Sequence, residues 1–123
     1  MGYESKLYIV EKSNLTPDKN GKRYANVIAM FDMCKFYELS DILREQKETD
    51  CYIFADDGNT KILKDRYDQK LTEVSIPFVI STLEKILEGG ETYRRIYPLL
   101  NALKAFNEQK DKWGDIVVLH YGY

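Results

Sequence analysis

Residues 51–64 read Cys-Tyr-Ile-Phe-Ala-Asp-Asp-Gly-Asn-Thr-Lys-Ile-Leu-Lys, and they carry the clearest local signal in the chain. Two runs rich in strand-forming residues, 51–56 and 59–64, flank the pair Asp57-Gly58. Because both positions of a type I′ turn need a positive φ, Asp-Gly is typical of that turn between antiparallel strands. This stretch therefore predicts a β-hairpin.

Three further strands are predicted from their apolar patterns. They cover residues 3–10, 24–31 and 115–121. The strand at 24–31 carries apolar side chains on both faces, which suits a central strand better than an edge strand. Residues 13–22 collect turn formers and are expected to form a solvated loop. The last strand is apolar on both faces at Ile116–Leu119, so we expect it inside the sheet, next to a strand formed much earlier.

Three helices are expected from apolar residues at helical spacing. They run from Phe36 to Gln46, from Ile76 to the glycines at 89–90, and from Thr92 to about Trp113. Ser75 is placed to cap the second helix, and Pro77 suits its first turn. Pro98 lies inside the third helix as predicted, so it should kink that helix or split it.

The chain of 123 residues is long enough to bury one core, and no linker or repeat divides it. We therefore expect a single domain over residues 1–123. Residues 66–72 are expected to be irregular or a weak strand end. The predicted fold is α+β, in the order β-β-α-β-β-α-α-β, with a mainly antiparallel sheet of about five strands and its helices on one face.

The charge balance bears on possible partners. Eighteen Lys and Arg against twenty Asp and Glu give a net charge of −2, which disfavours nucleic-acid and membrane surfaces. Residues 32–57 hold eight acidic and three basic residues, so this segment should form an electronegative end. With no signal-peptide pattern and no apolar run near ~20 residues, the expected location is cytoplasmic.

Few residues suggest metal or catalytic chemistry. Cys34, Cys51 and the single histidine, His120, are too few for a zinc site, which needs about four such ligands. Cys51 opens an apolar run and is expected to be a buried, reduced thiol. His120 offers a general base, but with no identifiable nucleophile it is better interpreted as a packed strand residue.

Asp56 and Asp57 offer oxygen ligands to a hard cation, but the pattern of a calcium loop does not continue after Asn59. The turn itself needs Asp and Gly for backbone reasons, so the structural interpretation is preferred. We therefore expect no catalytic residue, no metal and no cofactor.

Residues Tyr93, Arg94, Arg95 and Tyr97 form the one compact aromatic and basic cluster. Arginine forks bind phosphates and tyrosine rings stack on bases, so the cluster is a candidate ligand or partner contact. The alternative is that the arginines are solvated, paired with Glu91 or the acidic end, and that the tyrosines belong to the core.

Ten tyrosines are unusual for this length, and four of them lie near the ends of the chain: Tyr3, Tyr8, Tyr121 and Tyr123. If the terminal strands are neighbours, these rings would form one patch of the kind enriched at recognition surfaces. The alternative is tyrosine at the margin of the core, with its hydroxyl in water. We expect Tyr121 to be ordered and packed, and Tyr123 to cover a neighbouring strand or a partner.

Three stretches carry a resemblance to a group of proteins. Residues 1–12, the hairpin residues 52–61 and the closing His-Tyr-Gly-Tyr at 120–123 resemble those of small uncharacterised proteins of Gram-positive bacteria and their phages or prophages. The resemblance implies a mobile-element setting and no activity that can be assigned to a residue. In such a setting, small proteins often bind a host or defence protein.

The sequence as a whole favours a small, non-enzymatic protein-interaction module, with a phage or prophage type modulator as its specific form. Its polar residues cluster by charge and not around a nucleophile or a set of ligands. The alternative is a small-molecule or nucleotide-binding domain that uses Arg94, Arg95 and nearby tyrosines. A protein partner is expected, and a homo-oligomer stays open.

Overall fold

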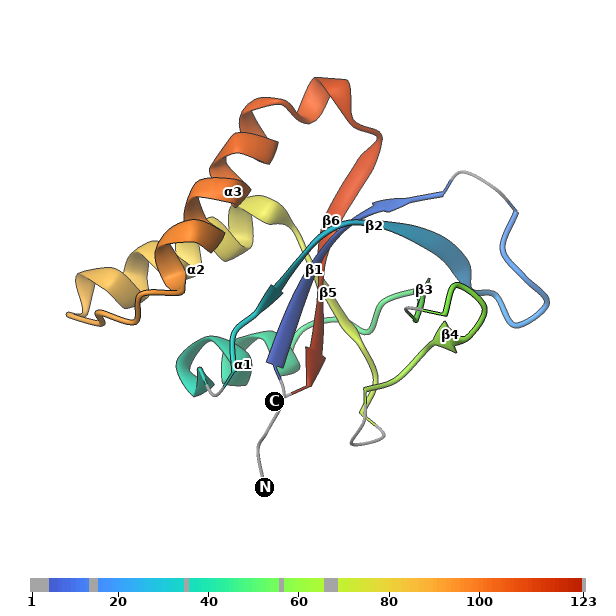
Figure 1. Cartoon of the computed structure of the whole chain (residues 1–123), viewed down its shortest axis with the longest axis horizontal. Helices are drawn as coiled ribbons and strands as arrows, with labels where there is room; N and C mark the ends of the chain where they lie inside the picture. Colours follow the sequence, from blue (N-terminus) through green and yellow to red (C-terminus); the bar gives the residue numbers. More distant parts are fainter. Residues whose placement is uncertain (1–4, 14–15, 35, 56, 66–68, 123) are drawn as a thin grey trace.

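The computed structural model describes residues 5–122 except 14–15, 35, 56 and 66–68. Within this part, six strands form one sheet and three α-helices pack against it (Figure 1). The elements are β1 (Ser5–Lys12), β2 (Arg23–Asp32), α1 (Tyr37–Arg44), β3 (Cys51–Phe54), β4 (Lys61–Ile62), β5 (Thr72–Val74), α2 (Ile76–Glu88), α3 (Ile96–Glu108), the 3-10 helix η1 (Lys110–Lys112) and β6 (Asp115–Gly122). The predicted α+β class is confirmed.

The sheet has the strand order β4-β3-β2-β1-β6-β5. Strand β1 pairs antiparallel with β2 and β6, β6 pairs antiparallel with β5, and β3 with β4. The pair β2–β3 is parallel, so the sheet is mixed although mainly antiparallel, as predicted. The last strand lies inside the sheet beside the first, also as predicted.

Strand β5 was not expected. It has only three residues, Thr72–Val74, and begins at the end of the segment predicted to be irregular. Three residues are too few for an alternating pattern to stand out. The strand exists because β6 offers it a partner, with Thr72 opposite His120 and Val74 opposite Val118.

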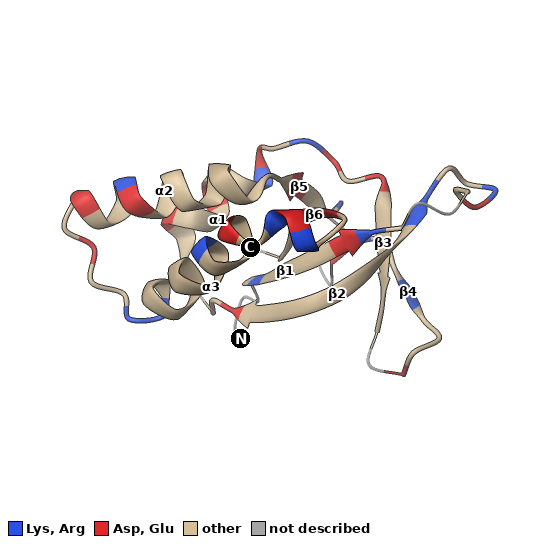
Figure 2. Ribbon diagram, turned by 90° about the horizontal axis from the view of Figure 1, so that it is seen from above, with Lys and Arg blue, Asp and Glu red and all other residues tan. Residues whose placement is uncertain are grey.

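The three helices cover one face of the sheet, and Figure 2 shows them grouped together on that side. One buried cluster joins the three helices to β1 and β6, with Leu7, Ile9 and Val118 from the sheet. A second, smaller cluster lies where the β3–β4 hairpin folds over the other face, and it contains Val10, Ala25, Cys51, Ile53 and Leu119. Among the described residues, it is thus the hairpin that covers the second face of the sheet.

The β-hairpin is confirmed, but its turn differs from the predicted type. Ile53 pairs with Ile62, and the Ala55 amide donates to the Thr60 carbonyl at 2.8 Å, so the loop is longer than two residues. Gly58 has φ +73°, whereas Asp57 does not adopt a positive φ. The reason is that the Asp57 carboxylate instead accepts from the amides of Asn59 and Thr60 and from the Thr60 hydroxyl.

The second predicted helix is confirmed with its cap, because the Ser75 hydroxyl accepts from the Phe78 amide at 3.2 Å. The third helix begins later than predicted, at Ile96 and not near Thr92. Pro98 then falls in the first turn, where an amide has no intrahelical partner to lose. The predicted kink is therefore wrong.

Candidate interaction site at the edge of strand β2

The second half of β2 forms an open edge of the sheet. Strand β3 pairs with β2 only at Arg23 and Tyr24, and then diverges from it. From Asn26 to Asp32, no described strand lies on that side of β2. Figure 2 shows β2 along the outer margin of the sheet, with β1 on its inner side. The prediction of a central strand is thus correct for the start of β2 and wrong for the rest.

Two backbone hydrogen bonds show which groups point away from the sheet. Met33 donates to the Ser5 carbonyl at 2.8 Å, and Ser13 donates to the Tyr24 carbonyl at 2.9 Å. Because hydrogen-bonded and non-bonded pairs alternate in an antiparallel ladder, the N–H and C=O groups of Val27 and Met30 face outward. A partner strand would meet these groups.

The edge has an irregular register. Ile9 pairs with Ala29 and Val10 with Val27, so Ile28 is an extra residue in β2, a β-bulge. Bulges are one way in which proteins discourage edge-to-edge pairing, and charged residues or proline are others. Between Tyr24 and Phe31 the strand has no charged residue and no proline. The bulge is therefore the one protective feature in this stretch.

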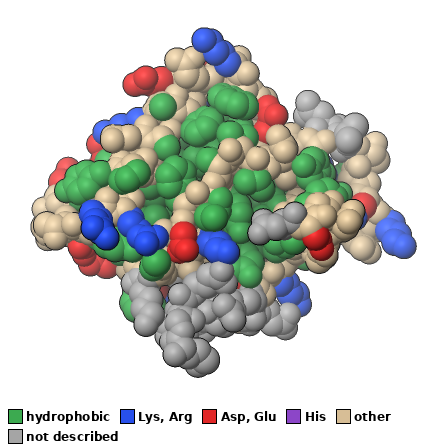
Figure 3. Space-filling model, viewed as in Figure 1, with side chains coloured by type: hydrophobic (Ala, Val, Ile, Leu, Met, Phe, Trp, Pro, Cys, Tyr) green, Lys and Arg blue, Asp and Glu red, His purple; other side chains and the backbone are tan. Residues whose placement is uncertain are grey.

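Apolar side chains are exposed along the same edge. Val27 is 38% exposed and Met30 is 47% exposed. Figure 3, which views this side of the molecule, shows hydrophobic side chains across the middle of the face. The open edge thus combines outward backbone groups with an apolar surface.

A hollow of about 320 Å³ lies beside the edge, on the face of the sheet that the helices do not cover. It is lined by residues of five strands and the hairpin loop: Lys6, Tyr8, Val27, Met30, Phe54, Ala55, Ile62 and Tyr121. The Tyr8 and Tyr121 rings meet edge to face, with centroids 6.3 Å apart. The Lys6 ammonium lies 5.7 Å from the centre of the Tyr121 ring. The hollow is therefore apolar and aromatic, with a cation at its rim.

The predicted gathering of terminal tyrosines is confirmed for Tyr8 and Tyr121, because β1 and β6 are neighbours. Tyr121 is also half-buried, as expected. Gly122 has φ +98°, which lets the chain turn after this residue. Tyr3 and Tyr123 lie outside the described residues.

The β3–β4 hairpin is held beside the hollow by a second aromatic group. The Tyr24 ring contacts Tyr52 and Phe54, with centroids 5.9 and 5.3 Å away. Lys61 lies over the Tyr52 ring at 4.3 Å and pairs with Asp18 at 3.1 Å. These contacts hold the hairpin, and with it Phe54, in place as one wall of the hollow.

The predicted cluster at 93–97 lies elsewhere, at the Asp32 end of β2. The Tyr93 hydroxyl donates to the Met33 carbonyl at 2.9 Å, and its ring packs on Phe36 with centroids 4.9 Å apart. Burial raises the pKa of Tyr93. Arg95 donates to the Asp32 carbonyl at 2.5 Å. Tyr93 and Arg95 therefore hold the start of α3 against the sheet.

Arg94, Arg95 and Tyr97 are exposed, whereas Tyr93 is half-buried. None of these residues lines the aromatic hollow, which Tyr121 does. The structure thus separates the predicted contact residues into two groups and does not bring them into one patch. Phosphate binding by Arg94 and Arg95 stays a prediction.

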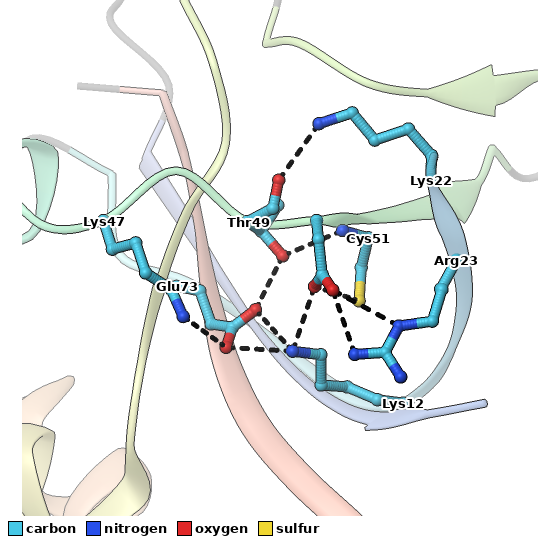
Figure 4. Close-up of polar contacts among 8 residues, drawn as sticks. Lys12, Lys22, Arg23, Lys47, Thr49, Cys51 and Glu73 are labelled. Carbon is cyan, nitrogen blue, oxygen red and sulfur yellow. Dashed lines mark hydrogen bonds and ion pairs between the residues drawn. The ribbon is translucent and has the colours of Figure 1, made fainter. Parts of the chain in front are cut away.

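A partly buried ionic cluster, shown in Figure 4, lies at the other end of β2. The Lys12 ammonium contacts Asp50 at 3.0 Å and Glu73 at 3.1 Å, and Arg23 binds the other oxygen of Asp50 at 2.9 Å. The Thr49 hydroxyl donates to Glu73 at 2.8 Å. These groups connect β1, β2, β5 and the start of β3.

The pKa shifts in this cluster follow from burial and pairing. Burial alone would raise the pKa of Asp50, but the hydrogen bonds from Lys12 and Arg23 outweigh it and hold that pKa well below its usual range. Burial opposes the charge of Lys12, and its bonds to Asp50 and Glu73 still raise its pKa. No local pattern in the sequence indicates this cluster, because its members come from four distant segments.

The same cluster contains three potential metal ligands, Asp50, Cys51 and Glu73, whose ligand atoms lie within 4.8 Å of one another. The Lys12 ammonium already pairs with both carboxylates, and Arg23 pairs with Asp50 as well. Burial also raises the pKa of Cys51 to about 11, so its thiol keeps the proton that a metal ligand would have to lose. The cluster therefore acts as structural ion pairing, and Cys51 is the buried free thiol that was predicted.

His120 is buried in β6, as predicted for a packed strand residue. Its Nε2 lies 3.3 Å from the Ser5 hydroxyl, which lies 2.8 Å from the Ser40 hydroxyl. Burial, followed by the charge of Arg44, lowers the pKa of His120 to about 4. A serine next to a histidine is the pairing of a nucleophile and a base. Here all three side chains are buried, so the triplet is a structural hydrogen-bond chain.

A scan of protein-family models, a search of curated proteins and a search of solved structures each find no match to this chain. No helix in the described residues is long and apolar enough to span a bilayer. What the chain binds is therefore inferred from the shape, charge and hydrogen-bonding groups of its own surface.

Proposed function

We propose that this protein is a non-enzymatic interaction module that binds an extended segment of a partner protein along the open edge of β2. The observation that carries the proposal is that β3 pairs with β2 only at Arg23 and Tyr24, while the eight residues that follow stay in strand conformation. This stretch has outward backbone groups and no charge before Asp32.

Strand addition supplies both affinity and specificity at such an edge. An added strand would hydrogen-bond to the outward N–H and C=O groups of Val27 and Met30. Alternate side chains of that strand point to opposite faces, so one set would lie over the hollow between Tyr8, Phe54 and Tyr121. That hollow suits an apolar or aromatic side chain.

The resemblance to small proteins of Gram-positive bacteria and their phages supports a specific setting. In a mobile-element setting, the partner would be a host or defence protein, and this chain would modulate it by occupying one of its strands or loops. The protein would then be a binding module that performs no chemistry of its own.

Affinity capture with edge variants tests the proposal. Met30→Pro removes one outward N–H without removing a bond to β1, and Val27→Lys places a charge on the edge. Leu63→Lys is the matched control, since Leu63 is also exposed but does not line the hollow. We expect a stoichiometric partner from a Gram-positive lysate to bind the wild type and Leu63→Lys, and to be lost by both edge variants.

Hydrogen exchange on the captured complex adds a direct readout. Binding should slow exchange at the amides of Val27 and Met30. A partner that the folded edge variants still retain, or a complex whose protection lies elsewhere, would contradict the proposal. Melting temperatures of the free variants show whether they are folded.

A further inference from the structure

A second surface feature lies in the helical layer, between α1 and α2, and not on the sheet face that holds the hollow. It is a groove of about 650 Å³ that also reaches the loop after α2. Its lining residues are Glu38 and Ile42 from α1, Phe78, Thr82, Lys85 and Ile86 from α2, and Gly89, Gly90 and Glu91 after it. Ile42 and Phe78 are more than a third exposed. The groove thus presents an apolar floor to solvent.

One end of this groove is acidic. The carboxylate of Glu91 is held in place, because it accepts from the amides of Thr92 and Tyr93 at 2.9 and 3.0 Å. Glu38 of α1 lines the same groove, and its pKa is raised by desolvation and by the neighbouring Glu91 carboxyl. Two neighbouring carboxyl groups repel each other when both are ionised, and a cation between them relieves that repulsion.

We propose that the groove between α1 and α2 binds an amphipathic helix of a partner protein, with a Lys or Arg beside its apolar face seated between Glu38 and Glu91. Apolar side chains of that helix would pack on Ile42, Phe78 and Ile86. This site is separate from the edge of β2 and does not depend on strand addition.

Charge complementarity decides the occupant. Lys85 is the one cation among the described residues that line the groove, whereas the carboxyl pair lies at the end formed by α1 and the loop after α2. A helix fits because its apolar stripe can lie along a groove formed by two other helices, as in helix-in-groove recognition. An acidic helix would place like charges together and is disfavoured there.

The test uses two labelled helical peptides of about 14 residues, or about four turns. Both carry the same leucine face, and one carries lysines on its flanks where the other carries glutamates. We expect saturable binding of the lysine peptide by fluorescence anisotropy, with its affinity at least about tenfold above that of the glutamate peptide. Titration followed by NMR should shift the amide signals of α1 and α2.

Variants separate this proposal from the one for β2. Glu38→Lys reverses one charge, and Phe78→Asp disrupts the apolar floor. Each variant should lower the affinity for the lysine peptide by about tenfold or more. Met30→Pro should leave its affinity unchanged. Equal binding of both peptides, equal binding by wild type and Glu38→Lys, no saturable binding, or NMR shifts confined to β2 would each overturn the proposal.

Discussion

The two halves of strand β2 differ in whether another strand pairs with them on the side away from β1. The first half, at Arg23 and Tyr24, is closed by β3 and reinforced by the ion pairs that Lys12 forms with Asp50 and with the buried Glu73. The second half, from Asn26 to Asp32, has no described strand on the side away from β1, and Val27 and Met30 are exposed there. The sheet is therefore closed where charges bring distant segments together, and open where the strand is uncharged.

The largest effect is expected from breaking the closed half. Lys12→Met would leave Glu73 buried without its main cation, so the free energy of unfolding should fall by about 3–5 kcal/mol in chemical denaturation. The Lys12 side chain is 8% exposed and that of Glu73 is 9% exposed, which makes solvent a poor substitute. Lys47→Met is the control, because Lys47 contacts the same carboxylate from a side chain that is 75% exposed. Lys47→Met should lower the free energy of unfolding by less than about 1 kcal/mol. Equal losses for the two variants would contradict the assignment of Lys12 as the main cation of Glu73.

A second prediction concerns β6, which is paired on both sides. The pKa of His120 is about 4 in the folded protein and about 6.5 when unfolded, so the unfolded chain binds more protons between these values. This group should therefore leave stability unchanged above pH 7 and lower it by about 3 kcal/mol as the pH falls to 4. Urea unfolding of wild type and His120→Gln, compared across pH 4–8, isolates this contribution. Parallel pH profiles would show that His120 titrates normally.

The third prediction contrasts adjacent residues of the open half. Ala29 lies in a hydrogen-bonded pair with Ile9, whereas the N–H of Met30 faces outward. Ala29→Pro removes a ladder hydrogen bond and should lower the free energy of unfolding by about 1–3 kcal/mol, with Met30→Pro costing clearly less. Amide exchange in the wild type should follow the same order, faster at Met30 than at Ala29. The reverse order would mean that this edge is oriented differently.

The smallest effect is expected at the hairpin that closes the first half of β2. Gly58 has φ +73° and open space where a Cβ would lie, so Gly58→Ala is strained by its backbone conformation alone. The expected loss in the free energy of unfolding is about 1–2 kcal/mol. Gly58→Asn should cost less, since asparagine tolerates this region better. Thermal unfolding measures both, and a loss for Gly58→Asn that equals or exceeds that for Gly58→Ala would contradict this explanation.

Several features of the fold and the candidate site could be predicted from local residues. The Ser75 cap acts on the amide three residues later, and the residues around Asp57-Gly58 suffice to form a hairpin. Two predictions failed because of groups that are also close in the chain. The Asp57 carboxylate accepts hydrogen bonds that set a different turn type, and α3 begins at Ile96, so Pro98 lies in its first turn. Such competing local solutions have similar energies, so a pattern alone does not rank them.

The contact between Tyr8 and Tyr121 depends on the strand order, which local sequence patterns do not determine. Sequence analysis expected Tyr8 and Tyr121 to meet if the terminal strands are neighbours, and the strand order fulfils that condition. The open edge of β2 had no such signal, because two-faced apolarity is equally typical of a buried central strand. The edge exists because β3 diverges after Tyr24, and this depends on a loop and a hairpin far along the chain.

The sequence by itself determined the local elements of this protein: the hairpin, the capped helix α2, and the burial of Cys51 and His120. These depend on residues that are close in the chain, where backbone preference and apolar spacing act directly. Only the tertiary structure decided which side of β2 stays open, and that Lys12, Asp50 and Glu73 converge in one cluster. The physical reason is that strand pairing and buried ion pairs gain their energy from contacts between distant segments, which no short stretch of sequence contains.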